Sequence, residues 1–198
     1  MGENPKSIFV IGSLGVENLK KITFYRKDEI EKKIKTRLFK NNFLITFHPE
    51  TLGKSKLTEN LNKFLNCMKK VKNTKFIFTA PNADMGNAKI FKILKKFVKL
   101  NKHKSLLVDS LGHKLYLSLA NNCNLVIGNS SSGIIEIPSL NIPSINIGRR
   151  QDGRIKSNSV IDCNISLKSF EAALKKGLSK KFRNSLKKNA NPYYKRNS

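Results

Sequence analysis

The chain has 198 residues, of which 39% are hydrophobic, and this is enough for one domain with a proper core. No apolar stretch is long enough to cross a bilayer, and the N-terminal apolar run is too short for a signal peptide. The net charge of +26 directs attention to polyanionic partners, whether nucleic acid, membrane surface or nucleotide phosphates.

The charge by itself is a weak indicator of function. The lysines are spread along every expected helix, and the chain is rich in Lys, Asn and Ile together, which favours a lysine-solvated surface over a binding patch. A nucleic-acid module would also interleave aromatic and basic residues on one face, whereas most phenylalanines here occupy strand or helix-core positions. We therefore disfavour a nucleic-acid partner and keep it as an alternative.

Cysteines and ligand motifs narrow the class further. Cys67, Cys123 and Cys163 stand in apolar contexts without metal-ligand spacing, which predicts reduced core thiols of a cytoplasmic protein. No cluster of His, Cys and carboxylates has the spacing of metal ligands, so we expect no metal. A GxGxxG or Walker motif is absent too, so neither NAD nor ATP is implied and no cofactor is expected.

Apolar runs alternate with helical patterns along the chain. We expect strands at residues 7–12, 43–47, 75–80, 105–108, 124–128 and 144–148, which are nearly continuously apolar. We expect helices at residues 57–70, 86–100, 113–122 and 166–178, where apolar residues recur at helical spacing. This alternation predicts an α/β fold with a Rossmann-like, doubly wound parallel sheet.

In such sheets, ligands bind at the carboxyl ends of the strands. After residues 124–128 the chain turns into a helix expected to start near Ser131, and the N-terminus of a helix attracts anions. Asn129 and Ser130 are expected N-caps, and the serine hydroxyls add donors. The turn suits a phosphate or diphosphate, although an ordinary capped helix with a Ser-rich turn explains it as well.

Two further features favour a nucleotide. Glu136 lies in a run of isoleucines, where a carboxylate is costly without partners, and it could accept hydrogen bonds from two ribose hydroxyls. Its alternative role is that of a capping carboxylate. Arg149, Arg150 and Arg154 follow the next strand, and arginine binds phosphate oxygens bidentately. Together these residues predict a nucleoside-diphosphate site.

Three motifs resemble those of a known family. GNSSSGIIEIPSLNIPSINIGRRQDGR (128–154), ITFHPET (45–51) and FTAPNADMGN (78–87) resemble the hydrolysing, sialic-acid-pathway type of UDP-N-acetylglucosamine 2-epimerase. The resemblance implies the second half of a glycosyltransferase-B-like two-domain architecture. Residues 1–24 would then be an interdomain connection, 25–190 the UDP-binding domain and 191–198 a truncated C-terminal segment.

The resemblance also implies site residues. His48 would project into the cleft near the sugar–phosphate linkage and support catalysis. From the residues alone, a histidine at a strand end before a proline is more often structural, and His103 and His113 have no comparable support. The substrate-binding residues implied are Ser130 and Ser131 at the diphosphate, Glu136 at the ribose, Arg150 near the UDP and Asn82 near the uracil and ribose.

The activity implied is conversion of UDP-N-acetylglucosamine and water to N-acetylmannosamine and UDP, through elimination of UDP to a glycal and then hydration. The family carries its acid–base carboxylates on a first domain that this chain does not resemble. We therefore expect a UDP-binding half that is inactive alone, with a missing or separate N-terminal catalytic domain as partner and a homodimer as one possible assembly. The alternatives are a non-catalytic UDP-sugar-binding module and a related epimerase acting on a UDP-diacetamido-sugar.

Overall fold

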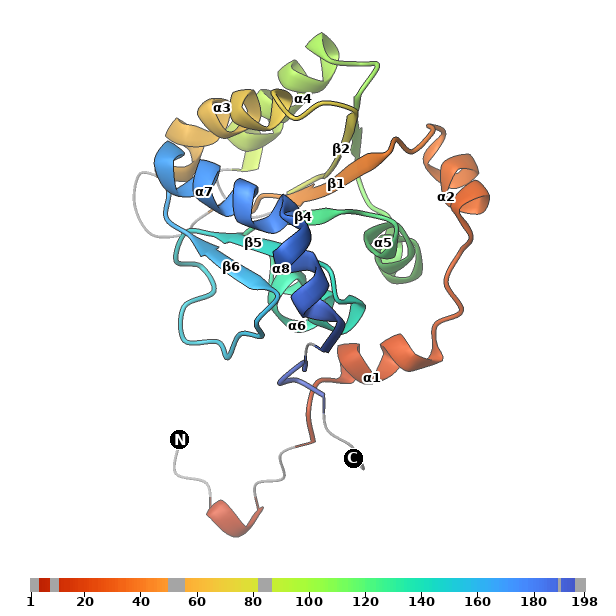
Figure 1. Ribbon diagram of the computed structural model, residues 1–198, viewed down its shortest axis with the longest axis vertical. Coiled ribbons are helices and arrows are strands. Elements are labelled where there is room, and N and C mark those ends of the chain that lie inside the picture. Colours follow the sequence, from red (N-terminus) through yellow and green to blue (C-terminus); the bar gives the residue numbers. More distant parts are fainter. Residues whose placement is uncertain (1–3, 8–10, 50–55, 82–86, 189, 195–198) are drawn as a thin grey trace.

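A computed structural model describes residues 4–7, 11–49, 56–81, 87–188 and 190–194 of the chain (Figure 1). Within these ranges one sheet of parallel strands runs in the order β3-β2-β1-β4-β5-β6. The strands are β1 (Asn41–Thr46), β2 (Thr74–Thr79), β3 (Ser105–Val108), β4 (Leu125–Gly128), β5 (Ser144–Ile147) and β6 (Val160–Cys163). The predicted doubly wound parallel α/β sheet is confirmed.

Helices cover both faces of the sheet (Figure 1). One layer consists of α3 (Lys56–Lys69), α4 (Asn87–Leu100) and α7 (Leu167–Leu178). The other contains α2 (Lys27–Ile34), α5 (Gly112–Asn121) and the 3-10 turn η2 (Ile137–Leu140). The remaining elements are η1 (Pro5–Ser7), α1 (Leu14–Lys21), α6 (Ser132–Ile135), α8 (Lys180–Ser185) and η3 (Leu186–Lys188).

The two layers explain why the strands read as unbroken apolar runs. Along β1, Phe43 and Ile45 pack into the core under α3, α4 and α7, while Leu44 packs into the core under α2 and α5. Both sets are fully buried, since a strand's successive side chains point to opposite faces and both faces are covered. Cys67, Cys123 and Cys163 are buried free thiols, as predicted.

The strand pattern differs from the prediction at two places. Of the expected strand at residues 7–12, Ser7 belongs to η1 and residues 11 and 12 have no regular structure, while 8–10 lie outside the described residues. β6 was not predicted, because the exposed Asp162 interrupts its apolar pattern. Its pairing with β5 identifies it as a strand of the sheet.

The start of α1 and the last described segment, residues 190–194, lie side by side (Figure 1). The Ser13 N–H donates to the carbonyl oxygen of Tyr193 (3.0 Å), and the Lys20 ammonium donates to the Tyr194 hydroxyl (2.7 Å). The Asn191 side chain donates to the Ile135 carbonyl oxygen at the end of α6 (2.8 Å). These bonds hold α1 next to α6. No helix in the described ranges has the length and apolar character needed to span a membrane.

The chain reverses its winding direction at β1, which lies between β2 and β4. The carboxyl ends of β1 and β4 approach closely here: a Cβ at Gly128 would lie 1.8 Å from the Thr46 carbonyl oxygen, and Gly128 has φ of 144°. Only glycine fits this position. In open α/β sheets such a switch point is where ligands bind, so the fold itself marks the place to look.

Candidate functional site

An open cleft of about 330 Å³ lies at the carboxyl ends of β1 to β4, beside this switch point. Its size is at the lower end of the range found for ligand sites. The lining residues are Thr46, His48, Thr79, Ala80, Asp109, Ser110, Leu111, Gly112, His113, Tyr116, Ser130, Ser132 and Glu136. The cleft therefore brings together His48, Ser130 and Glu136, three of the residues predicted to form the site.

The residues between β4 and α6, Asn129 to Ser131, form what we call the serine turn. Ser131 occupies the N-cap position of α6 without a capping hydrogen bond from its side chain, so the predicted caps Asn129 and Ser130 were wrong. Ser130 and Ser132 line the cleft. Gly133 lets the turn settle on β5, because a Cβ at this position would lie only 2.7 Å from the Ser144 hydroxyl oxygen.

Asn129 joins the ends of β1 and β4 and is fully buried. Its side-chain Oδ1 accepts from the His48 N–H (2.7 Å), and its Nδ2 donates to the His48 carbonyl oxygen (2.9 Å). The side chain thus makes the same pair of bonds with His48 that a neighbouring strand would make. This fixes the main chain of His48, itself only 6% exposed, at the cleft. Sequence reasoning missed this role because an Asn after a strand is also a common N-cap.

The arginines after β5 differ in position. Arg150 donates from Nη1 to the Asn129 carbonyl oxygen (3.2 Å), which the Gln151 side chain also contacts (2.9 Å). Arg149 points away: its side chain is 92% exposed and pairs with Asp152 at 2.8 Å, and this bond raises the pKa of the Arg149 guanidinium. Arg154 is exposed. The predicted arginine cluster is therefore reduced to Arg150, which reaches the serine turn.

Glu136 is held by two elements that sequence reasoning did not connect with it. Its side chain is 18% exposed, and its Oε1 lies 3.1 Å from Nε2 of His113, near the start of α5. On another side lies the first turn of α1, where a Cβ at Gly15 would be 3.0 Å from the same oxygen. No spacing in the sequence places residues 15, 113 and 136 together, so only the fold reveals this arrangement.

Tyr116 and Ser132 line the cleft, and their buried hydroxyl oxygens make no hydrogen bond of good geometry with a described residue, although Ser132 lies next to the Tyr116 hydroxyl. Burial raises the pKa of Tyr116 to about 12, although Ser132 and Thr46 lie near its hydroxyl. Buried polar atoms are almost always paired, so an unpaired one requires an explanation such as a ligand or an ordered water. Tyr116 carries no sequence signal, because it lies in a helix with core-like spacing.

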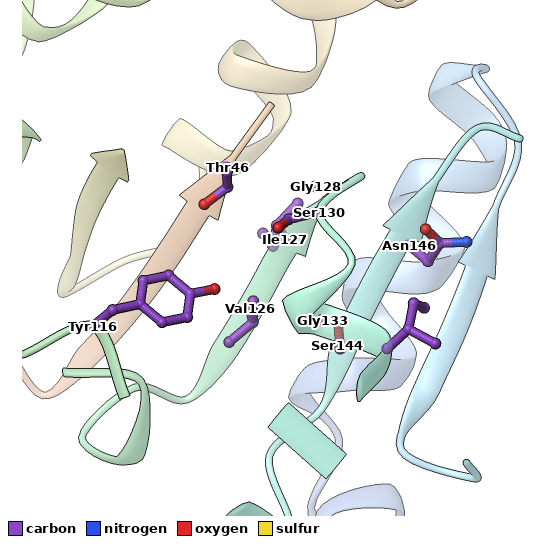
Figure 2. A pocket seen from close by; sticks show the side chains of 10 residues that line it. Thr46, Tyr116, Val126, Ile127, Gly128, Ser130, Gly133, Ser144 and Asn146 are labelled. Carbon is purple, nitrogen blue, oxygen red and sulfur yellow. The ribbon is translucent and has the colours of Figure 1, made fainter. Parts of the chain in front are cut away.

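A second, much smaller cavity of about 10 Å³ lies behind the serine turn. Figure 2 shows Thr46 and Tyr116 on one side of it and Ser144 and Asn146 on the other. Its volume accommodates at most about one water molecule. The buried Asn146 Oδ1 has no partner in the described part of the chain, which suits such a water. This cavity supports the turn and is too small for a substrate.

Asn82, predicted to lie near the uracil and ribose, falls outside the described residues and stays a prediction. Ser131 and Arg150 do not line the cleft, although both belong to segments that border it. In the ranges that the structure describes, no three His, Cys, Asp or Glu side chains gather as metal ligands would.

Comparison with known proteins shows the family. The family model described as UDP-N-acetylglucosamine 2-epimerase matches residues 1–198. The chain is 40% identical over 183 residues to the GDP/UDP-N,N'-diacetylbacillosamine 2-epimerase (hydrolyzing) of Campylobacter jejuni, covering 92% of this chain and 47% of that protein. It is 38% identical to polysialic acid biosynthesis protein P7 of Escherichia coli, covering 100% of this chain and 50% of that protein. The chain thus spans about half the length of these relatives.

Solved structures show the same fold. The co-structure of S. aureus MnaA with UDP matches with a TM-score of 0.74 at 15% identity, covering 98% of this chain and 51% of that one. The Methanocaldococcus jannaschii UDP-GlcNAc 2-epimerase in complex with UDP-GlcNAc and UDP matches with a TM-score of 0.67 at 17% identity, covering 98% and 53%. Fold, serine turn and whole-chain family match agree, and the chain belongs to the UDP-N-acetylglucosamine 2-epimerase family.

Proposed function

We propose that the cleft binds the UDP part of a UDP-N-acetylhexosamine and that the chain is the nucleotide-binding half of a hydrolysing 2-epimerase. Ser130 and Ser131 contact the diphosphate, Glu136 the ribose and Arg150 the UDP, with Asn82 near the uracil and ribose. His48 stands near the sugar–phosphate linkage and supports departure of UDP. The proposed reaction converts UDP-N-acetylglucosamine and water to N-acetylmannosamine and UDP through a glycal.

The observation that carries this proposal is the polar lining of the cleft. The hydroxyl-bearing residues Ser130, Ser132 and Tyr116 line it together with the carboxylate of Glu136. Hydroxyl donors beside a carboxylate acceptor suit a ligand that presents both anionic oxygens and hydroxyl groups. A nucleoside diphosphate presents both. The structures of relatives named as complexes with UDP support this assignment at the level of fold.

Catalysis needs acid–base groups at the sugar, and the described lining of the cleft offers few of them. Removing and adding protons at the sugar requires acid–base groups within hydrogen-bond reach of the reacting carbons. Asp109 and Glu136 are the carboxylates that line the described cleft, and Glu136 is already committed to His113. We therefore propose that turnover requires carboxylates from a second domain or chain and that this chain alone binds UDP without consuming UDP-sugar. The connecting role of residues 1–24 and a homodimer stay predictions.

A second substrate is favoured by one observation. The C. jejuni relative, at 40% identity, is named for diacetylbacillosamine, whereas the Neisseria meningitidis relative named UDP-N-acetylglucosamine 2-epimerase is 27% identical. A UDP-diacetamido-sugar is therefore the alternative substrate. The two differ at the sugar, and the described cleft residues proposed above contact the nucleotide, so both substrates share the same UDP site.

Calorimetric titration with UDP, UMP and a short single-stranded DNA at low and high salt tests the proposal. We expect saturable UDP binding that exceeds UMP binding and weakens about 10- to 150-fold in Glu136→Gln, the value of a hydrogen bond to a charged group. Glu171→Gln, which changes an exposed glutamate on α7, is the matched control and should leave UDP affinity unchanged. Binding of DNA alone, lost at high salt, would contradict the proposal and favour the charge as the functional feature.

A further inference from the structure

Glu136 is positioned by two parts of the chain that are distant in sequence. We propose that His113 is a positioning residue, which holds one carboxylate oxygen of Glu136 so that the other oxygen is presented to the ribose of a bound nucleoside diphosphate. Gly15 completes this arrangement from the side of α1. The inference rests on the proposed UDP site and adds the residues that make its carboxylate specific for a ribonucleotide.

The hydrogen-bond geometry supports this role for His113. The His113 Nε2 lies 3.1 Å from Glu136 Oε1, and an ionised carboxylate can only accept, so Nε2 carries the proton and donates. The His113 side chain is 47% exposed and the Glu136 side chain 18%, so the histidine closes off the carboxylate from the solvent side. Both residues line the cleft. A carboxylate has two oxygens, and one bond from the protein leaves Oε2 for a ligand.

Because residue 15 is a glycine, α1 can lie close to the Glu136 carboxylate. A Cβ at position 15 would lie 3.0 Å from Glu136 Oε1 and 3.5 Å from its Cγ, so any larger residue would press on the carboxylate. The bonds from Ser13 and Lys20 to Tyr193 and Tyr194 hold α1 in this place. The carboxylate is therefore confined from both sides before any ligand arrives.

A fixed carboxylate has a specific consequence for ligand choice. If Oε2 meets the ribose hydroxyls, UDP should bind more tightly than its 2′-deoxy analogue dUDP, and this preference should depend on His113. A histidine that only stabilised the fold would change the affinity for UDP and dUDP equally. The ratio of the two affinities is therefore the discriminating measurement.

The test compares UDP and dUDP binding by calorimetry in the 198-residue chain. We expect His113→Ala to weaken UDP binding about three- to tenfold, the value of one hydrogen bond, and to leave dUDP nearly unchanged. His113→Gln, whose amide can replace Nε2–H as a donor, should restore the preference for UDP. In a Glu136→Gln background His113→Ala should have no further effect, since the two residues act through one bond. His103→Ala, which changes an exposed histidine on another loop, is the matched control.

Gly15→Ala provides a second variant whose fold should be preserved. Alanine has a higher helix propensity than glycine, so α1 should not be weakened by this change. We expect reduced UDP affinity with an unchanged or raised unfolding temperature. Unchanged UDP affinity in both His113→Ala and Gly15→Ala, in a protein where Glu136→Gln is defective, would overturn the inference and leave the UDP site intact.

The hydrogen bond can also be tested without any nucleotide. In ¹⁵N NMR spectra of the imidazole groups, Glu136→Gln should shift the His113 nitrogens and leave those of His103 in place. Failure of the wild-type chain to bind UDP would contradict the proposed function, whereas unshifted His113 nitrogens would contradict the positioning role itself. The two failures are thus distinguishable.

Discussion

Buried polar groups are fully hydrogen-bonded at the amino end of the sheet and partly unpaired at its carboxyl end. At the amino end, Asn42 is 4% exposed and its side chain is fully engaged: Oδ1 accepts from the Phe39 N–H, and Nδ2 donates to the carbonyl oxygens of Phe39 and Asn122. The Asn42 main chain bonds to Asn124 in both directions. At this end of β1 and β4, the Asn42 side chain is fully hydrogen-bonded within the protein and leaves no group for a ligand or water.

The carboxyl end of the same strands is left open. The buried side-chain atoms without a partner in the described ranges are Tyr116 Oη, Ser132 Oγ, Asn146 Oδ1 and Gln151 Oε1. Tyr116 and Ser132 line the cleft, Asn146 lies near the carboxyl end of β5 beside the small cavity, and Gln151 follows β5. Unpaired polar groups reduce stability, so their collection at one end indicates a site that a ligand or water completes. We therefore attribute the paired polar groups at the amino end to the fold and the unpaired ones at the carboxyl end to the candidate site.

The largest effect should come from breaking the close contact between the carboxyl ends of β1 and β4. Gly128→Ala would place a Cβ 1.8 Å from the Thr46 carbonyl oxygen and force β1 and β4 apart, so we expect a loss of more than about 4 kcal/mol in the free energy of unfolding. Gly153→Ala is the control, because Gly153 also has positive φ (79°) but no atom within 4 Å, and should cost about 1–2 kcal/mol. Urea denaturation measures both, and equal losses would contradict the close approach.

A smaller effect is expected when one polar side chain is removed at each end of the sheet. Asn42→Ala leaves the N–H and carbonyl oxygen of Phe39 without their partner, which should cost about 1–3 kcal/mol of unfolding free energy and leave UDP affinity unchanged. Ser132→Ala removes a hydroxyl that has no partner, so its stability should change by less than about 0.5 kcal/mol while UDP affinity falls. Denaturation and calorimetry on both variants measure this reciprocal pattern. Loss of stability in Ser132→Ala would mean that its hydroxyl is paired within the protein.

The smallest effect concerns Tyr116 at alkaline pH. Burial raises the pKa of Tyr116 to about 12, so the folded state favours the neutral phenol. The associated stability is present below about pH 10, the ordinary pKa of tyrosine, and is lost as pH rises through 12, amounting to about 1 kcal/mol by pH 11. Tyr116→Phe should remove this loss. Ultraviolet titration should show one of the four tyrosines ionising near pH 12 in the wild type and none there in the variant, whereas a normal titration of all four would contradict the burial.

Much of the fold was predictable because its signals are local. The strands β1, β2, β4 and β5 are buried apolar runs and the edge strand β3 is a half-buried one, while α3, α4, α5 and α7 have a clear apolar stripe, so period and hydrophobicity sufficed. β6 was missed because the exposed Asp162 interrupts its apolar pattern, and only its pairing with β5 identifies it as a strand.

The lining of the candidate site was predictable only in part. Ser130 and Glu136, which line the cleft, were predicted because polar residues after a strand of a parallel sheet point to its ligand-binding edge. Asn129 was misinterpreted as a cap, since the atom that it pairs with belongs to residue 48 on another strand. Arg149 was grouped with Arg150, although a one-residue step along the loop turns its side chain toward Asp152 and solvent.

By itself, the sequence determined the α/β class, the parallel sheet, the edge that carries the site and the family. These follow from hydrophobic periodicity, from the order of the elements and from motifs contiguous in the chain. The tertiary structure alone decided that Glu136 meets His113 and Gly15, that Asn129 secures His48 and that Tyr116 faces the cleft. Each of these contacts joins residues at least 20 positions apart or from different elements, and such distances are set by packing, which no local pattern encodes.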